Sequence, residues 1–335
     1  MSGEFDLIAR IRARAAAAAR NDVRLGIGDD AAILCVPVGH DLIVSTDTLN
    51  AGVHFPHDTA AFDIGWKTLA VNLSDLAAMA AQPAWCTLNL TLPDADAVWL
   101  DGFLDGFFAL ATRHGVALIG GDTTRGPLAI TVTVHGFVPH GEALRRDGAR
   151  VGDAVWVSGT LGDAAAGLRQ WREGSAMDAT LRVRLDRPTP RVELGLALRG
   201  IAHAGIDVSD GLLADLKHVL EASAVGGELD LASLPTSPSL LEGFDESTRQ
   251  RFQLGGGDDY ELCFTAPLSR ADDVRAAAAR AGVAVTCIGR IVDECGLRLR
   301  GRDGSLVAAP ALGYRHFSGA DEGEHDPGEG EKDAS

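Results

Sequence analysis

Lysine is nearly absent from this sequence of 335 residues, occurring only at Lys67, Lys217 and Lys332. None of the three stands in a G-x-x-x-x-G-K-[ST] pattern, which excludes the P-loop class of nucleotide-binding proteins. If the chain binds phosphate groups, their charge must be met by metal ions, arginines and backbone N–H groups.

The sequence also lacks long apolar runs and paired cysteines. No apolar stretch reaches the roughly 20 residues that cross a bilayer, and the polar N-terminal segment does not have the pattern of a signal peptide. The five cysteines are scattered and show no C-x-x-C spacing. We therefore expect a cytoplasmic protein without a membrane segment, structural zinc or an iron–sulfur cluster.

Positive charge is scarce as well, and the formal net charge is −17. A nucleic-acid-binding surface needs a broad positive patch, so we expect no nucleic-acid partner. Part of the negative charge falls in residues 319–335, which hold seven acidic side chains, one lysine and no large apolar residue. This composition predicts a disordered acidic tail outside the folded body.

What the sequence does contain is a series of carboxylates beside small or hydroxyl-bearing residues. The series comprises Gly26-Ile27-Gly28-Asp29-Asp30, Ser45-Thr46-Asp47-Thr48, Asp75, Gly120-Gly121-Asp122 and Asp207-Val208-Ser209-Asp210. Most of these motifs follow an apolar run, and α/β proteins place their sites at strand ends. Converging carboxylates repel one another unless hard cations intervene, and oxygen ligands suit Mg²⁺. We therefore interpret the chain as a Mg²⁺-dependent phosphoryl-transfer enzyme that uses ATP.

Each motif has a simpler structural explanation when it is taken alone. Glycine and aspartate favour turns, and both Ser45-Thr46-Asp47 and Asp207-Val208-Ser209-Asp210 are suited to capping a helix. The glycines of Gly120-Gly121-Asp122 also permit a close backbone approach to a phosphate, whose Mg²⁺ the aspartate can hold. Asp75 shares a predicted helix face with apolar residues, where a carboxylate needs a partner. The combination of motifs, and not any single one, favours a site.

The apolar pattern predicts two α/β units, the first in residues 1–138 and the second, an α/β sandwich domain, in residues 153–318, with a connector at 139–152. In the first unit it predicts the helices 62–81 and 97–114 and the strands 41–45, 85–92, 116–119 and 129–138. This β-α-β-β-α-β-like order indicates a mostly antiparallel sheet with helices. The strands at 41–45 and 116–119 are expected to end just before Thr46-Asp47 and Gly120-Gly121-Asp122.

Together these motifs resemble the thiamine-monophosphate kinase family, part of the superfamily named for aminoimidazole ribonucleotide synthetase. The matching blocks extend from about Gly3 to Phe317 and include Leu25-Gly26-Ile27-Gly28-Asp29-Asp30, Ser45-Thr46-Asp47-Thr48-Leu49, Ala70-Val71-Asn72-Leu73-Ser74-Asp75, Ile206-Asp207-Val208-Ser209-Asp210-Gly211 and Asp259-Tyr260-Glu261-Leu262. The resemblance implies the two-domain α/β fold of that superfamily and ATP-dependent phosphorylation of thiamine monophosphate to thiamine diphosphate with several Mg²⁺ ions. It also implies a homodimer joined through the N-terminal sheets.

The resemblance implies roles for individual residues as well. The implied metal ligands are Asp30, Ser45, Thr46, Asp47, Asp75, Asp122, Asp207 and Asp210. The implied ATP contacts are Gly121, Asp122, Arg146 and Ser209, and the implied substrate contacts are His54, Glu261 and Phe317. One departure is visible, because the family often has glutamate where this chain has Asp258.

The implied reaction joins two anions, since the acceptor is itself a phosphate monoester. Charge repulsion and in-line positioning are then the main obstacles, and no general base is needed. We accordingly expect no catalytic His–Asp pair. The carboxylates are expected to hold metals that supply the electrostatic stabilisation.

Two alternatives stay open at this point. Another ATP-using member of the superfamily, such as aminoimidazole ribonucleotide synthetase or selenophosphate synthetase, would share many of these motifs, although the reactive cysteine or selenocysteine near the N-terminus of the latter is missing. A non-catalytic Ca²⁺- or Mg²⁺-binding protein is disfavoured, because no D-x-D-x-D-G loop occurs and the acidic motifs lie far apart. ATP binding separates the classes, since a metal-storage protein should show none.

Overall fold

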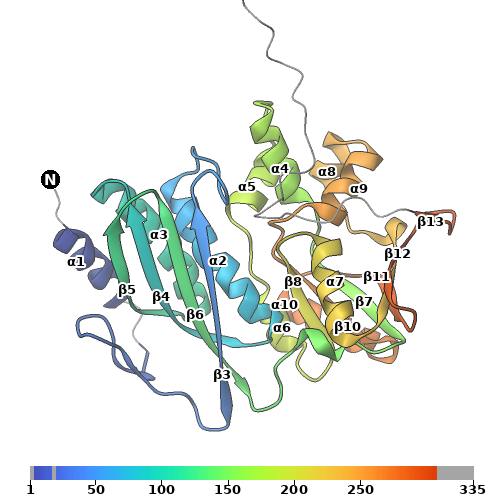
Figure 1. The fold of residues 1–335 in the computed structure, drawn as a ribbon, viewed down its shortest axis with the longest axis horizontal. Helices are drawn as coiled ribbons and strands as arrows, with labels where there is room; N and C mark the ends of the chain where they lie inside the picture. Colours follow the sequence, from blue (N-terminus) through green and yellow to red (C-terminus); the bar gives the residue numbers. More distant parts are fainter. Residues whose placement is uncertain (1–3, 17–19, 308–335) are drawn as a thin grey trace, which may run out of the picture.

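Two large β-sheets, each with helices packed against it, lie side by side along the long axis of the molecule (Figure 1), and a third sheet consists only of the short strands β1 (Val23–Leu25) and β2 (Ile33–Leu34). The computed structural model describes residues 4–16 and 20–307. Phe317 and the predicted tail at 319–335 therefore lie outside the described residues. The α/β class expected from the sequence is confirmed.

The N-terminal sheet has four strands in the order β3-β6-β4-β5. The β3/β6 and β6/β4 pairs are antiparallel, whereas β4 and β5 are parallel, so the prediction of a mostly antiparallel sheet is confirmed. The elements of this half are α1 (Glu4–Ala15), β1 (Val23–Leu25), β2 (Ile33–Leu34), β3 (His40–Asn50), α2 (Ala61–Ala78), β4 (Gln82–Leu92), α3 (Ala97–His114), β5 (Ala117–Arg125) and β6 (Ala129–Pro139).

Strands β3 and β5 are longer than the sequence pattern predicts. Thr46 and Asp47 lie inside β3, and Gly120-Gly121-Asp122 lies inside β5. The expectation that both strands end before these motifs is therefore wrong. The ladders that β3 forms with β6, and β5 with β4, continue through both motifs and override the local preference of glycine and aspartate for turns.

Helices α2 and α3 cover one face of this sheet and pack tightly on each other. A Cβ atom at Gly65 would lie 2.0 Å from the carbonyl oxygen of Phe103, and one at Gly106 would lie 1.8 Å from that of Phe62. Glycine at these two positions therefore lets the helix backbones touch. Because interiors of this density tolerate little movement, α2 holds its polar side chains in fixed positions.

The C-terminal sheet has seven strands in the order β13-β12-β9-β11-β7-β10-β8. The elements of this half are η2 (Arg146–Gly148), β7 (Asp153–Ser158), α4 (Asp163–Arg172), α5 (Ala179–Asp186), α6 (Val192–Ala197), β8 (Ala204–Val208), α7 (Leu212–Ser223), β9 (Gly226–Asp230), η3 (Leu231–Ser233), α8 (Pro238–Gly243), α9 (Glu246–Gly255), β10 (Glu261–Pro267), η4 (Leu268–Arg270), α10 (Ala271–Ala281), β11 (Val285–Val292), β12 (Gly296–Arg300) and β13 (Leu306–Val307). Among the helices so described, none is long and apolar enough to cross a bilayer.

Helix α2 also joins the two halves, since it packs on α6 and β8 of the C-terminal half. A Cβ atom at Gly195 of α6 would lie 2.1 Å from the Ala77 carbonyl oxygen, so these helices also meet backbone to backbone. The Trp66 indole N–H donates to the Pro188 carbonyl oxygen at 2.9 Å. One apolar cluster includes side chains from both sheets. The end of α2 that carries Asp75 is therefore fixed relative to both domains.

Candidate active site at the domain boundary

Strand β3 and helix α2 bring two of the predicted carboxylates together. Alternation along β3 turns Ser45 and Asp47 towards α2, where Asp75 lies three residues after Asn72. The Ser45 hydroxyl donates to Asp75 Oδ2 at 2.5 Å, and the Asp47 backbone N–H donates to Asn72 Oδ1 at 3.1 Å. The structure thus places Ser45, Asp47 and Asp75 in one site.

A further carboxylate comes from the C-terminal domain. Asp207 lies in β8, is 4% exposed and accepts a hydrogen bond from the Ser74 hydroxyl at 2.8 Å. Burial and then the neighbouring Asp75 raise the pKa of Asp207 to about 8. Burial and then Asp75 likewise raise the pKa of Asp47 to about 6. Carboxylates from β3, α2 and β8 are therefore close enough to hinder one another's ionisation.

This arrangement fits divalent cations bound together with phosphate groups. A hard cation removes the repulsion that raises these pKa values, and carboxylate and hydroxyl oxygens are suitable ligands for Mg²⁺. Within residues 4–16 and 20–307, no three Asp, Glu, His or Cys side chains already form a metal site by themselves. Mg²⁺ usually keeps waters and substrate phosphate oxygens in its shell, so an open set of carboxylates suits an ion that arrives with its phosphate ligand.

The loop after β8 is shaped by Asp215, a carboxylate that the motif pattern did not identify. Asp215 Oδ2 accepts hydrogen bonds from the backbone N–H groups of Ser209, Asp210 and Gly211 at 3.0, 3.1 and 3.1 Å. It is 3% exposed, and burial followed by the charge of Asp210 raises its pKa to about 7. Its position in the first turn of α7, where an acidic side chain can bond to free backbone N–H groups, is the sequence feature that could have identified it. Asp215 fixes the backbone from which Ser209 and Asp210 project.

Arg146 brings a positive charge to the same cluster from the connector between the domains. Burial raises the pKa of Asp75, while the Ser45 hydrogen bond and the charge of Arg146 oppose that rise. The Arg146 side chain is exposed and belongs to the short helix η2. It is therefore placed to contact an anion bound over the carboxylates.

Other predicted ligands lie apart from this cluster. Thr46 points to the opposite face of the sheet, where its hydroxyl lies 3.0 Å from Thr133 Oγ1. Asp122 is exposed on β5, whereas Asp47 lies on β3. Two strands, β6 and β4, separate β3 from β5, so β3 and β5 are about 14 Å apart at the usual spacing. Asp30 is exposed in the loop between β1 and β2. Within one copy of the chain, Thr46 and Asp122 are therefore not brought to the cluster.

Gly121 is required by the packing of the sheet itself. Its φ is +147°, and a Cβ atom there would lie 1.8 Å from the carbonyl oxygen of Leu88 in the neighbouring strand β4. Glycine is therefore needed at this position whether or not a phosphate binds nearby. The predicted contact between Gly121 and ATP stays a prediction.

The predicted substrate residue His54 lies in the tight turn that follows β3. Its Nδ1 accepts a hydrogen bond from the Asn50 backbone N–H at 2.9 Å. In the neutral imidazole the proton is then on Nε2, so this nitrogen is a donor. Phe317, the third predicted substrate residue, lies outside the described residues.

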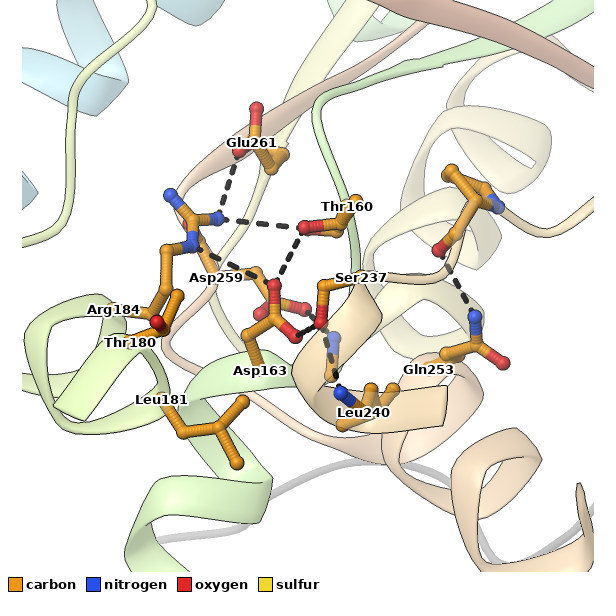
Figure 2. A network of polar contacts seen from close by, with 12 residues as sticks. Thr160, Asp163, Thr180, Leu181, Arg184, Ser237, Leu240, Gln253, Asp259 and Glu261 are labelled. Atoms are coloured by element: carbon orange, nitrogen blue, oxygen red, sulfur yellow. Dashed lines mark hydrogen bonds and ion pairs between the residues drawn. The ribbon is translucent and has the colours of Figure 1, made fainter. Parts of the chain in front are cut away.

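Glu261 is completely buried and belongs to an ion-pair network in the C-terminal domain (Figure 2). Its carboxylate accepts from the Ser158 hydroxyl at 2.5 Å, from Arg184 at 2.8 Å and from Arg191 Nε at 2.6 Å. Figure 2 shows Arg184 lying between Glu261 and Asp163. Charge-assisted bonds thus occupy both carboxylate oxygens, and Glu261 orients two arginines. Its predicted contact with substrate stays a prediction.

An α/β protein with two domains, and with carboxylates from both at their boundary, is the class that the fold and site define. Two family models match it: the N-terminal domain of AIR synthase related protein over residues 28–138, and the C-terminal domain of AIR synthase related protein over residues 150–302.

Comparison with individual proteins identifies the family within this group. The thiamine-monophosphate kinase of Escherichia coli K12 is 48% identical over 321 residues, covering 94% of this chain and 98% of the relative. A crystal structure of thiamine-monophosphate kinase from Stenotrophomonas maltophilia K279a is 55% identical, covers 91% of this chain and 98% of that chain, and superimposes with a TM-score of 0.84. The chain therefore belongs to the thiamine-monophosphate kinase family, within the AIR synthase related proteins.

The raised pKa values predict how the metal-free protein responds to pH. Asp47 and Asp207 keep protons in the folded state at pH values where they have lost them in the unfolded chain, whose carboxyl pKa lies near 3.8. The free energy of unfolding should therefore fall as the pH rises from about 4 to about 8. Asp207→Asn should flatten this fall over the whole range, whereas Asp47→Asn should flatten it only below about pH 6. Urea unfolding in EDTA across this pH range measures both effects, and a wild-type stability that increases with pH would contradict the assignment.

Proposed function

We propose that the protein transfers the γ-phosphoryl group of ATP to thiamine monophosphate and so forms thiamine diphosphate. The observation that carries the proposal is the cluster of Asp47, Asp75 and Asp207 at the domain boundary of a member of this kinase family. Further support comes from AaThiL, a relative with 32% identity and a TM-score of 0.74 over 94% of this chain and 97% of that chain, which is described in complex with AMPPCP and TMP. We expect the enzyme to act in the cytoplasm.

The proposed cofactor is Mg²⁺, with several ions in each site. The complete proposed ligand set is Asp30, Ser45, Thr46, Asp47, Asp75, Asp122, Asp207 and Asp210. When bound, Mg²⁺ would supply charge neutralisation for the donor and acceptor phosphates. Because the acceptor phosphate is already an anion, the chain does not need a general base to activate it.

The side chains around the carboxylates orient the proposed site. Ser45 and Ser74 donate to Asp75 and Asp207, so these acids keep a fixed direction when charged. The N–H groups of the loop from Ser209 to Gly211 already bond to Asp215, so the Ser209 hydroxyl is left as the group that contacts a phosphate of ATP. Arg146 would counter the charge of the same phosphates from the connector.

The substrate assignment predicts which acceptor stimulates ADP release. With ATP and Mg²⁺, thiamine monophosphate should support turnover, because the site is built to join two anions through cations. Free thiamine and an aminoimidazole ribonucleotide precursor should support little or none. A coupled assay of ADP formation compares the acceptors directly, and equal or faster ADP release with free thiamine would overturn the proposed acceptor.

We also propose a homodimer in which the N-terminal sheets of two copies meet. Strands β3 and β5 are the two edges of this sheet, and unpaired edges invite pairing with another strand. The sheet face turned away from α2 also exposes apolar side chains, with Leu42 at 42% and Val44 at 53%. Pairing β3 of one copy with β5 of the other would close both edges. It would also carry Asp122 of the partner subunit towards Thr46 and Asp47.

The dimer proposal predicts complementation between inactive variants. Asp47→Asn and Asp122→Asn should each nearly abolish turnover alone. After unfolding and refolding together, half of the dimers should be mixed, and each mixed dimer should hold one intact site, so roughly a quarter of wild-type activity should return. Each variant refolded alone is the control. If the mixture stays inactive while mixed dimers are detected by mass spectrometry, Asp122 does not act across the interface.

A further inference from the structure

Lys67 is a buried lysine in the middle of α2. It is 1% exposed, whereas Lys217, the other lysine among the described residues, is an exposed partner of Glu221. Burying an ammonium group costs free energy unless acceptors surround it. The contacts of Lys67 therefore show which parts of the structure compensate for its burial.

Those contacts lie on both sides of the domain boundary. Lys67 Nζ donates to the backbone carbonyl oxygen of His54 at 2.9 Å, in the turn that follows β3 of the N-terminal domain. It also donates to Asp258 Oδ2 at 3.1 Å, in the loop between α9 and β10 of the C-terminal domain. One ammonium group thus bonds to two loops that are about 200 residues apart in sequence and belong to different sheets.

The loop on the C-terminal side has a strained backbone that its hydrogen bonds hold in place. Asp258 has a φ of +68° and Tyr260 a φ of +50°, in the left-handed region that residues other than glycine rarely adopt. The Tyr260 hydroxyl donates to Asp258 Oδ1 at 3.0 Å. Such strain persists only where surrounding contacts over-determine the conformation. The Lys67 ammonium and the Tyr260 hydroxyl supply two of these contacts.

The loop that contains Asp258 also forms hydrogen bonds with the end of β8 and with Ser209, the residue proposed to contact ATP. The Asp258 N–H donates to the Ser209 carbonyl oxygen at 2.8 Å, and the Tyr260 N–H donates to that of Val208 at 2.8 Å. Lys67 is therefore linked through Asp258 to the Ser209 loop, and directly to the His54 turn.

We propose that Lys67 is a positioning residue that fixes the distance between the acceptor-side turn of His54 and the nucleotide-side loop of Ser209. The inference rests on the proposed function, with ATP at Ser209 and with thiamine monophosphate at His54, the contact that the family resemblance implies. In-line transfer between two phosphates depends on their alignment, and a misplacement of about 1 Å can cost about a hundredfold in rate. The carboxylate of Asp258 is thus assigned a role in alignment, as the anchor for Lys67.

Substitution of Lys67 tests this assignment through kcat. Lys67→Met should lower kcat about a hundredfold at saturating substrates while the KM for ATP changes by no more than about twofold, since no ATP contact is removed. Lys67→Arg, which keeps the charge and the donors, should recover part of the loss. Asp258→Asn should lower kcat as well, and the double variant should be little worse than Lys67→Met, because both changes break one link.

A second ion pair that joins α2 to the C-terminal half, this time to the residue after α5, serves as the control. Asp63 lies on α2, four residues before Lys67. Its Oδ1 is 2.5 Å from Arg187 Nε, and this ion pair also crosses the domain boundary. Arg187→Met should therefore cost stability without the fall in kcat. Circular dichroism at the assay temperature verifies that every variant is folded.

The possible outcomes separate this inference from the proposed function. A wild-type enzyme that does not phosphorylate thiamine monophosphate would refute the function. A wild-type enzyme that does so, with Lys67→Met retaining kcat or losing no more than Arg187→Met, would refute the positioning role alone. Additive losses in the Lys67→Met/Asp258→Asn double variant would refute the link through Asp258.

Discussion

Repulsion between buried and half-buried carboxylates is the constraint on which this structure depends. Asp47, Asp75 and Asp207 come from a strand, a helix and a second domain, and burial together with their mutual charge keeps the pKa values of Asp47 and Asp207 high. Such a cluster is costly in a protein without cations. It becomes favourable when divalent cations and phosphate groups occupy the boundary. Relief of this repulsion therefore favours the binding of metal and nucleotide together.

Helix α2 is the element that makes this cluster possible. It carries Asn72, Ser74 and Asp75, which contact β3 on one side and β8 on the other. Glycines at the crossings with α3 and α6 bring these backbones into contact, so the helix moves little relative to either domain. The same helix carries Lys67, whose ammonium group bonds to loops of both domains. Metal binding and alignment of the two substrates thus depend on one rigid helix.

The sequence predicted the fold class and the convergence of Asp47, Asp75 and Asp207 for identifiable reasons, while their roles as ligands stay predictions. Helical spacing placed Asp75 on a helix face shared with apolar residues, and the structure confirms that helix. The pattern failed where tertiary pairing overrides local preference, as at Asp47 and Asp122, which lie within strands and not in turns. The face to which Thr46 points depends on the register of β3 with β6, which local sequence does not specify.

Other residues were beyond the reach of sequence patterns because their partners are distant in the chain. The resemblance implied a substrate contact for Glu261, but nothing in the sequence indicated that this side chain is fully buried against Arg184 and Arg191. In the sequence, Lys67 gave no sign of its partner Asp258, which lies 191 residues away. Neither set of contacts follows from periodicity, since the Glu261 network depends on the tertiary fold of the C-terminal domain and the Lys67–Asp258 pair depends on how the two domains dock.

The claim that one set of cations joins the two phosphates is tested most directly by ³¹P NMR with Mn²⁺ in place of Mg²⁺. A bound paramagnetic ion broadens the resonance of any phosphate in its coordination shell. With AMPPCP and thiamine monophosphate both bound, the thiamine monophosphate signal should broaden in the wild-type protein and stay narrow with Asp47→Asn. A narrow thiamine monophosphate line in the wild-type complex, beside broadened AMPPCP lines, would contradict the account.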